Sequence, residues 1–183
     1  MTETEKVESN GELSSFALLF NEVSRETSKE IVQWILQANF GENSPDVLNL
    51  IINSPGGEMA SAFAIIDVIN SSKIPVRTIG IGEISSAGLL IFIAGAKGQR
   101  ILTPNTSILS HQWSGGSCGK KHELIATRRE HELVEKRMID HYISSTGLTE
   151  AKVKKYLLPD ADVYLDAQEA KKYGICDIVA LIR

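Results

Sequence analysis

Several polar residues stand at the ends of apolar segments, where they could carry out acyl transfer. That reaction needs a nucleophile, a base, an orienting carboxylate and amide donors for the developing oxyanion. Ser86 separates a strand-like segment from an apolar helix-like one, and free N–H groups at a helix N-terminus favour negative charge. His111 ends the segment SILSH, and Asp160 and Asp162 follow Pro159. Each also has a simpler structural interpretation: Ser86 as a helix N-cap, His111 as a hydrogen-bonded strand end and the aspartates as turn residues.

Glycines mark a second group of candidate residues in the middle of the chain. Ten of the 14 glycines fall between Gly56 and Gly119, and glycine permits tight turns and close backbone approach. The Gly56-Gly57 turn follows an apolar segment and could hold a phosphate or an oxyanion. No phosphate-loop pattern supports a phosphate, because SGGSCGKK at 114–121 has Ser in place of the first Gly and Lys in place of the magnesium-binding Ser or Thr.

The overall composition excludes several classes of protein. The 183 residues carry 19 basic and 23 acidic side chains, a net charge of −4, so no basic field exists to hold nucleic acid. The longest apolar run, at 87–96, is too short to span a bilayer, which takes about 20 residues. Two cysteines, Cys118 and Cys176, cannot form a disulfide framework and fit a reducing compartment. These observations predict a cytoplasmic protein with no nucleic-acid or membrane partner.

The order of patterns predicts one domain behind a short tail. Residues 1–15 are polar and acidic, wrong for a signal peptide, and are expected to form a mobile tail; residues 16–183 are expected to form a single domain. Strand-like and helix-like patterns alternate along that domain, which predicts an α/β fold with a largely parallel sheet. We expect strands at 16–20, 46–52, 76–81, 100–103, 107–110, 163–165 and 175–182, and helices at 24–40, 58–71, 86–96, 122–145, 149–158 and 166–174.

Two of the expected helices carry further local signals. Thr27 and Glu30 have the spacing of a capping box for the helix at 24–40. His122, His131 and His141 lie on the long helix without the i, i+4 spacing of a helical metal pair, so we expect them on a solvated face. The sequence therefore predicts no metal site.

Taken together, several segments resemble the ClpP family of serine proteases. Colinear motifs at family-like spacing are far more specific than any one of them. The matching segments are INSPGG at 52–57, IGEISSAG at 81–88, AGAKGQR at 94–100, PN at 104–105, HQ and GG at 111–112 and 115–116, and AQEAKKYGICD at 167–177.

The resemblance implies a role for each of the candidate side chains. Ser86 would be the nucleophile, His111 the general base and then the general acid, and Asp162 the orienting carboxylate. The stretch before Asp162 is slightly longer than in the family, so Asp160 stays the alternative acid. No cofactor is implied.

The resemblance also assigns roles to backbone groups. The N–H groups of Gly57 and Ala87 would form the oxyanion hole. An extended polypeptide substrate would pair along an edge that includes Gly56 on one side and Gly115 and Gly116 on the other. Only amides are needed for these contacts, so Ala at position 87, where the family usually has Met, is expected to do no harm.

The family also implies a fold and an assembly. We expect an α/β, ClpP/crotonase-like fold: parallel β-sheets with surrounding helices, and a protruding handle helix. The implied homo-oligomer is two stacked seven-membered rings around a chamber. An AAA+ unfoldase ATPase is the family's partner, but the N-terminal tail does not match the family's axial-loop segment, which argues against such docking.

Three alternatives share the fold. The first is a dedicated processing peptidase, for capsids or precursors, that works without an unfoldase. The second is an assembly subunit without turnover, against which the retained Ser, His and Asp argue. The third is a crotonase-type acyl-CoA enzyme, which shares an amide oxyanion hole but has no use for a serine and histidine pair.

Overall fold

The computed structural model describes residues 15–42 and 44–182. The expected tail falls almost wholly outside these residues, because the description begins at Ser15. The described chain forms a mixed α/β fold around a seven-stranded sheet, with the order β1-β2-β3-β4-β7 and with β5 joining β3 to β6. The strands are β1 (Phe16–Leu19), β2 (Leu48–Ser54), β3 (Val76–Ser85), β4 (Arg100–Leu102), β5 (Ser107–Ser110), β6 (Val163–Leu165) and β7 (Ile178–Val179).

The predicted, largely parallel sheet is confirmed. Every strand pairing is parallel except that of β5 with β6, which is antiparallel. Strand β2 is buried along most of its length, as expected for a parallel strand covered on both faces. Strand β3 runs four residues beyond the expected end, because it pairs with β4 through Gly80 and then turns at Gly82, whose φ is +65°, to pair with β5. The closing strand is shorter than expected.

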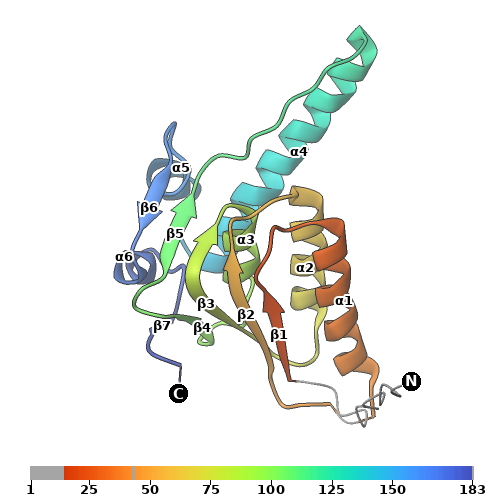
Figure 1. Cartoon of the computed structure of the whole chain (residues 1–183). Helices are drawn as coiled ribbons and strands as arrows, with labels where there is room; N and C mark the ends of the chain where they lie inside the picture. The colour runs from red at the N-terminus through yellow and green to blue at the C-terminus, as the bar shows by residue number, and fades with distance from the viewer. Residues whose placement is uncertain (1–14, 43, 183) are drawn as a thin grey trace, which may run out of the picture.

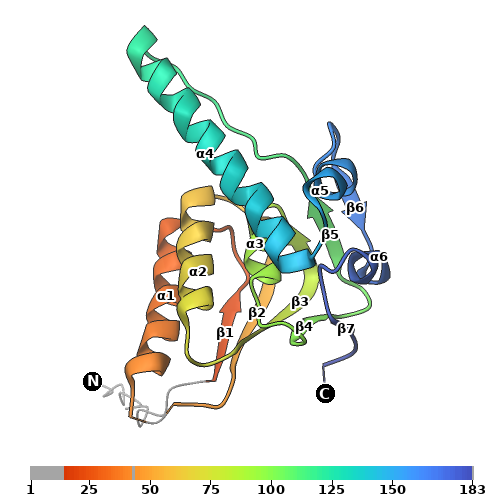
Figure 2. The ribbon, with the colours of Figure 1, turned by 180° about the vertical axis from the view of Figure 1, so that it is seen from behind.

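Helices cover the sheet and extend beyond it (Figures 1 and 2). Helices α1, α2 and α3 pack side by side on one face of the sheet, with α4 next to α3. The apolar faces of these helices and the sheet enclose one core, whose largest fully buried side chains are Tyr142 and Phe92. The helices are α1 (Arg25–Phe40), α2 (Met59–Ser71), α3 (Ala87–Ile93), α4 (Lys121–Thr146), α5 (Glu150–Tyr156) and α6 (Ala167–Lys172).

The capping box of α1 lies one turn earlier than the sequence pattern indicated. Ser24 is the N-cap, and its side chain accepts a hydrogen bond from the Thr27 N–H at 3.3 Å. The Thr27 hydroxyl in turn accepts from the Ser24 N–H at 2.9 Å. The expected pairing of Thr27 with Glu30 is therefore wrong, since Thr27 itself occupies the position that Glu usually fills.

Helix α4 projects from the body of the domain, and the strap, residues 111–120, runs beside it in an extended conformation (Figure 1). Along α4 only Met138, Ile139 and Tyr142 near its C-terminal end are buried. The projecting half carries exposed apolar side chains, including Ile125 at 62% exposure. The expected protruding helix is thus present in the structure.

The base of α4 is fixed by a buried ion pair. The Arg100 guanidinium contacts the Asp177 carboxylate at 2.6 Å and also donates to the Ser145 carbonyl at 2.8 Å, so it joins β4, the C-terminal segment and α4. Within the described ranges no helix combines the length and hydropathy needed to cross a bilayer.

Candidate active site

The junction of β3 and α3 holds Ser86 in a strained backbone conformation. Its φ and ψ are 54° and −124°, and it is the one described residue other than glycine with a positive φ. Such a conformation costs about 1–3 kcal/mol and persists only where its surroundings impose it. Ser86 occupies the N-cap position of α3, as the simpler interpretation expected, but its side chain makes no capping hydrogen bond to the helix. Its hydroxyl is left available for other chemistry.

The Gly56-Gly57 turn packs directly against this junction. A Cβ on Gly56 would lie 2.6 Å from the Cβ of Ser86 and 2.8 Å from the carbonyl oxygen of Ser85. The Gly56 N–H donates to the Ser54 hydroxyl at 3.2 Å, and the Gly56 carbonyl accepts from the Val23 N–H at 2.7 Å. Since a carbonyl oxygen can accept two hydrogen bonds, Gly56 keeps one acceptor position for a substrate strand.

Two unpaired backbone donors lie beside Ser86. Gly57 forms a parallel bridge with Val23, in which Glu58 donates to the Val23 carbonyl at 2.7 Å and the Gly57 N–H takes no part. In the described part of the chain that N–H has no hydrogen-bond partner. Ala87 is the first residue of α3, so its N–H has no acceptor within the helix. Both predicted oxyanion donors are therefore close to the nucleophile position and free to donate.

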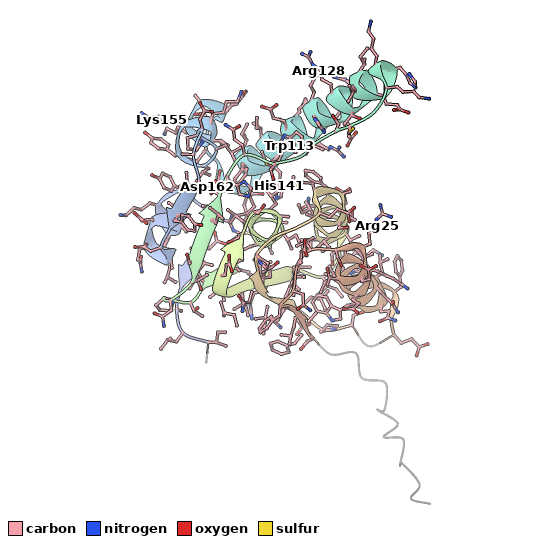
Figure 3. The ribbon with its side chains drawn as sticks, turned by 45° about the horizontal axis from the view of Figure 1, so that its top comes forward. Arg25, Trp113, Arg128, His141, Lys155 and Asp162 are labelled. Atoms are coloured by element: carbon pink, nitrogen blue, oxygen red, sulfur yellow. The ribbon has the colours of Figure 1, made fainter. Side chains whose placement is uncertain are left out.

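Strand pairing brings His111 and Asp162 to the same edge. Strand β5 is parallel to β3, and the Ser86 N–H donates to the Leu109 carbonyl at 3.0 Å. Strand β6 is antiparallel to β5 with Ser110 opposite Val163, so the next position in register sets His111 opposite Asp162. Figure 3 shows Asp162 at this end of the two strands.

A shallow pocket of about 330 Å³ contains His111 together with both candidate acids. The two acids have different surroundings, because the Gln112 amide donates to the Asp160 carboxylate at 3.0 Å, whereas Asp162 directly precedes β6. Among the described residues the His111 side chain makes no hydrogen bond to Ser86 or to Asp162. The structure thus brings His111 together with both candidate acids, and it links the Ser86 backbone to the same strand through the Leu109 carbonyl. Among the described residues the hydrogen bonds of an assembled triad are absent.

The strap borders a second and larger pocket. Trp113 lies in this strap, and its ring packs against the backbone of Gly115 and against the His131 ring of α4, with the Trp113 and His131 ring centroids 4.5 Å apart. His131 is therefore half-buried against Trp113 and not fully solvated as expected. Beside Trp113 lies a pocket of about 530 Å³, lined by Gln112, Trp113, Glu135, Met138, Ile139, Lys154, Lys155, Leu158, Pro159 and Asp160. Gly116, also in the strap, has no atom within 4 Å of the position that a Cβ would occupy.

Comparison with known proteins identifies the family. The family described as Clp protease matches residues 7–183. The chain belongs to the Clp protease family. One relative, named ATP-dependent Clp protease proteolytic subunit, from Oltmannsiellopsis viridis, is 33% identical over 162 residues, which cover 88% of this chain and 82% of the relative. The family resemblance drawn from the motifs is confirmed, and the observed mixed α/β fold agrees with it. Membership of the Clp protease family implies a protease with polypeptide substrates and an oligomeric assembly.

Three hydroxyl groups near the candidate site of this Clp protease family member, those of Ser54, Ser110 and Tyr142, were not among the site residues predicted from the sequence. Ser54 accepts from the Gly56 N–H and donates to the Asn21 carbonyl at 2.7 Å, which fixes the turn beside Ser86. Ser110, which precedes His111 in the chain, forms a buried contact with the Tyr142 hydroxyl at 2.9 Å. Ser54 and Ser110 could have been found from the sequence, because each is a polar residue at the end of an apolar, strand-like segment.

The remaining histidines and cysteines of this Clp protease family member lie outside the site. His141 is not solvated as expected, because its Nε2 lies 2.8 Å from the Leu90 carbonyl oxygen. Burial lowers the pKa of His141, although the bond to Leu90 and the charge of Asp67 oppose this. Cys118 is exposed in the strap, whereas burial raises the pKa of the Cys176 thiol to about 11. Across residues 15–42 and 44–182, no three His, Cys, Asp or Glu side chains are arranged to hold a metal ion.

Proposed function

We propose that this chain is a serine endopeptidase that cleaves extended polypeptides by Ser–His–Asp acyl transfer. One observation carries the proposal: Ser86 adopts a strained, positive-φ conformation at a strand-to-helix junction with two unpaired N–H donors beside it. Backbone strain at a polar residue is typical of an active site, since it must be maintained by the surrounding structure. Family membership supports a protease of this kind.

In the proposed reaction the Ser86 hydroxyl oxygen attacks the carbonyl carbon of the substrate peptide bond. His111 takes the hydroxyl proton as the new C–O bond forms, and the N–H groups of Gly57 and Ala87 stabilise the oxyanion. His111 then gives that proton to the leaving amine as the C–N bond breaks. Water, activated by the same imidazole, releases the acyl group and restores Ser86.

Asp162 is the proposed orienting carboxylate. The register of β5 with β6, which ends at Ser110 opposite Val163, supports this choice, because one further step would set His111 opposite Asp162. The Asp160 carboxylate, in contrast, already binds the Gln112 amide. A carboxylate beside the imidazole fixes its tautomer and stabilises the imidazolium that forms during attack. His111 has to turn toward both partners when a substrate is bound, as catalytic hydrogen bonds often tighten only then.

The substrate and the assembly follow from the same proposal. An extended peptide would pair along Gly56 and Gly57 on one side and along the strap at Gly115 and Gly116 on the other. The proposed assembly is a homo-oligomer of two stacked seven-membered rings in the cytoplasm, joined through α4, whose projecting half exposes Ile125 and other apolar side chains. An unfoldase ATPase forms no part of this proposal.

Labelling with a fluorophosphonate probe, followed by mapping of the modified residue, tests the proposal. We expect stoichiometric modification of Ser86 that is lost in Ser86→Ala and in His111→Ala, together with hydrolysis of fluorogenic peptides by the unmodified chain. Ser85→Ala is the matched control, because Ser85 is the adjacent serine and its hydroxyl instead donates to Glu83 at 2.8 Å. Correctly assembled rings that take up no label would contradict the proposal and favour an assembly subunit or an acyl-CoA enzyme.

A further inference from the structure

A buried chain of hydroxyl groups begins at Ser110, the residue before His111. Ser110, the last residue of β5, has no exposed surface, and its Oγ lies 2.6 Å from the Leu157 carbonyl oxygen and 2.9 Å from the Tyr142 hydroxyl. Tyr142 belongs to α4, and Leu157 is the C-cap of α5. These hydrogen bonds therefore join β5, α4 and the end of α5 next to the candidate site.

The direction of these hydrogen bonds follows from the chemistry of the groups. A carbonyl oxygen can only accept, so the single hydroxyl proton of Ser110 is donated to Leu157. The Tyr142 hydroxyl must then donate to Ser110. Burial raises the pKa of Tyr142 to about 12, so this phenol keeps its proton throughout the neutral range. The order of donation from Tyr142 through Ser110 to Leu157 is thereby fixed.

The residue on the other side of His111 binds the same segment. The Gln112 amide nitrogen lies 3.2 Å from the Leu158 and Pro159 carbonyl oxygens and 3.0 Å from the Asp160 carboxylate. Both neighbours of His111 thus hold the segment 157–160, which leads directly to Asp162. The pocket around His111 contains two other titratable groups, the carboxylates of Asp160 and Asp162.

We propose that Ser110 and Tyr142 are positioning residues that hold the segment 157–162 against the end of β5 and so keep the Asp162 carboxylate beside His111. This inference rests on the proposed function. Ser110 makes the larger contribution, because its loss leaves the Leu157 carbonyl buried without a partner, whereas loss of the Tyr142 hydroxyl removes only the outer bond.

The pH profile of the reaction distinguishes positioning from a merely structural role. A carboxylate beside a catalytic base favours the charged form of that base, so displacing Asp162 is expected to move the acidic limb of the rate profile. We expect Ser110→Ala to move the acidic limb of kcat, which reports the substrate-bound state, to lower pH and to reduce kcat about tenfold with KM nearly unchanged. Tyr142→Phe is expected to have the same effects to a smaller extent. Ser110→Thr keeps the hydroxyl group, so we expect it to show the pH profile of the unmodified chain.

The experiment measures peptide hydrolysis and the rate of fluorophosphonate labelling of Ser86 between about pH 5 and pH 8, the range in which histidine titrates. Thr78→Val is the matched control, since the buried Thr78 hydroxyl donates to the Phe92 carbonyl at 2.8 Å, away from His111. We expect this control to lower the melting temperature without moving the acidic limb. In the Asp162→Asn background, Ser110→Ala is expected to move the limb no further.

Several outcomes would overturn the inference. One is a folded Ser110→Ala with the kcat and the acidic limb of the unmodified chain; another is an equal shift in Thr78→Val. If Ser110→Ala does not fold, the same comparison of kcat and of the acidic limb is made with Tyr142→Phe, and unchanged values would overturn the inference. Failure of the proposed function is recognised separately, because the unmodified chain itself would then take up no label at Ser86, and the inference would fall with it.

Discussion

The backbone of Gly56 lies so close to Ser86 that a Cβ at position 56 would come within 2.6 Å of the serine Cβ. Gly56 also has a φ of +96°, a conformation that residues with a Cβ rarely adopt. The turn after β2, which contains Gly56, and the junction after β3, which contains Ser86, are therefore in direct contact, so a shift of one would displace the other. Their contact sets Ser86, the proposed nucleophile, beside the Gly56-Gly57 turn.

Gly56→Ala is expected to abolish most of the activity. The added methyl group must push the turn away from Ser86, which withdraws the Gly57 donor, and loss of one oxyanion donor costs about 10²- to 10³-fold in kcat. Peptide hydrolysis and circular dichroism of the purified variant measure the two effects separately. Gly98→Ala is the matched control, because Gly98 also has a positive φ, +83°, but open space around it. Full activity in folded Gly56→Ala would contradict the prediction.

Ser86→Gly is expected to be more stable than Ser86→Ala, although both are inactive. Glycine adopts the φ of 54° without strain, whereas alanine keeps the steric cost of about 1–3 kcal/mol. The greater flexibility of glycine in the unfolded chain offsets about 0.5–1 kcal/mol of that gain. Melting temperatures of the two variants, compared at the same protein concentration, measure the difference. A lower melting temperature for Ser86→Gly than for Ser86→Ala would mean that Ser86 is unstrained in solution, because only the flexibility of glycine would then separate the two variants.

The order of the elements could be predicted from the sequence because burial on both faces leaves nearly continuous apolar runs in parallel strands such as β2. Boundaries were harder to predict where tertiary contacts override the local pattern. Strand β3 continues past Ile81 because β5 supplies a new partner from residue 83 onward, and no local pattern encodes that partner. The capping box of α1 was misassigned for a similar reason, since two overlapping polar pairs fit the motif and only the backbone of Ser24 decides between them.

The site could be predicted in part. Ser86, His111 and the glycine turn stand out because each ends an apolar segment, and the family motifs agree with that reading. The choice between Asp160 and Asp162 could not be made from the sequence, because it depends on the pairing of β5 with β6 across more than 50 residues of chain. Ser110 and Tyr142 could not be paired either, since 32 positions separate them.

Asp162→Asn is expected to lower kcat far more than Asp160→Asn. An amide in place of the orienting carboxylate stabilises the wrong tautomer of the base, an effect of about 10⁴-fold in the serine protease triad. Asp160→Asn retains an oxygen that accepts from the Gln112 amide, so its loss of kcat is expected to stay below about tenfold. Peptide hydrolysis under saturating substrate gives both values. The opposite order would assign the acid to Asp160.

Stability is expected to fall in mildly acidic solution because of His141. Burial lowers the pKa of this imidazole below its ordinary value of 6.5, against the opposing effects of the Leu90 carbonyl and Asp67. The unfolded chain therefore binds the proton at a higher pH than the folded chain does. The stabilisation is complete above about pH 6.5 and is lost as the pH drops from there toward the lower pKa of the folded state.

His141→Gln removes that titration while keeping a side-chain donor near Leu90. We expect the melting temperature of the unmodified chain to fall more steeply between about pH 7 and pH 5 than that of His141→Gln. His122→Gln is the matched control, because His122 is exposed on the same helix, and its curve is expected to follow that of the unmodified chain. Parallel curves for all three proteins would mean that His141 can take up a proton without leaving its contact with the Leu90 carbonyl. If the melting temperatures of His141→Gln and the unmodified chain diverge as the pH falls, whereas those of His122→Gln do not, the contact between α4 and α3 is the acid-sensitive one. Leu90 belongs to α3 and His141 to α4.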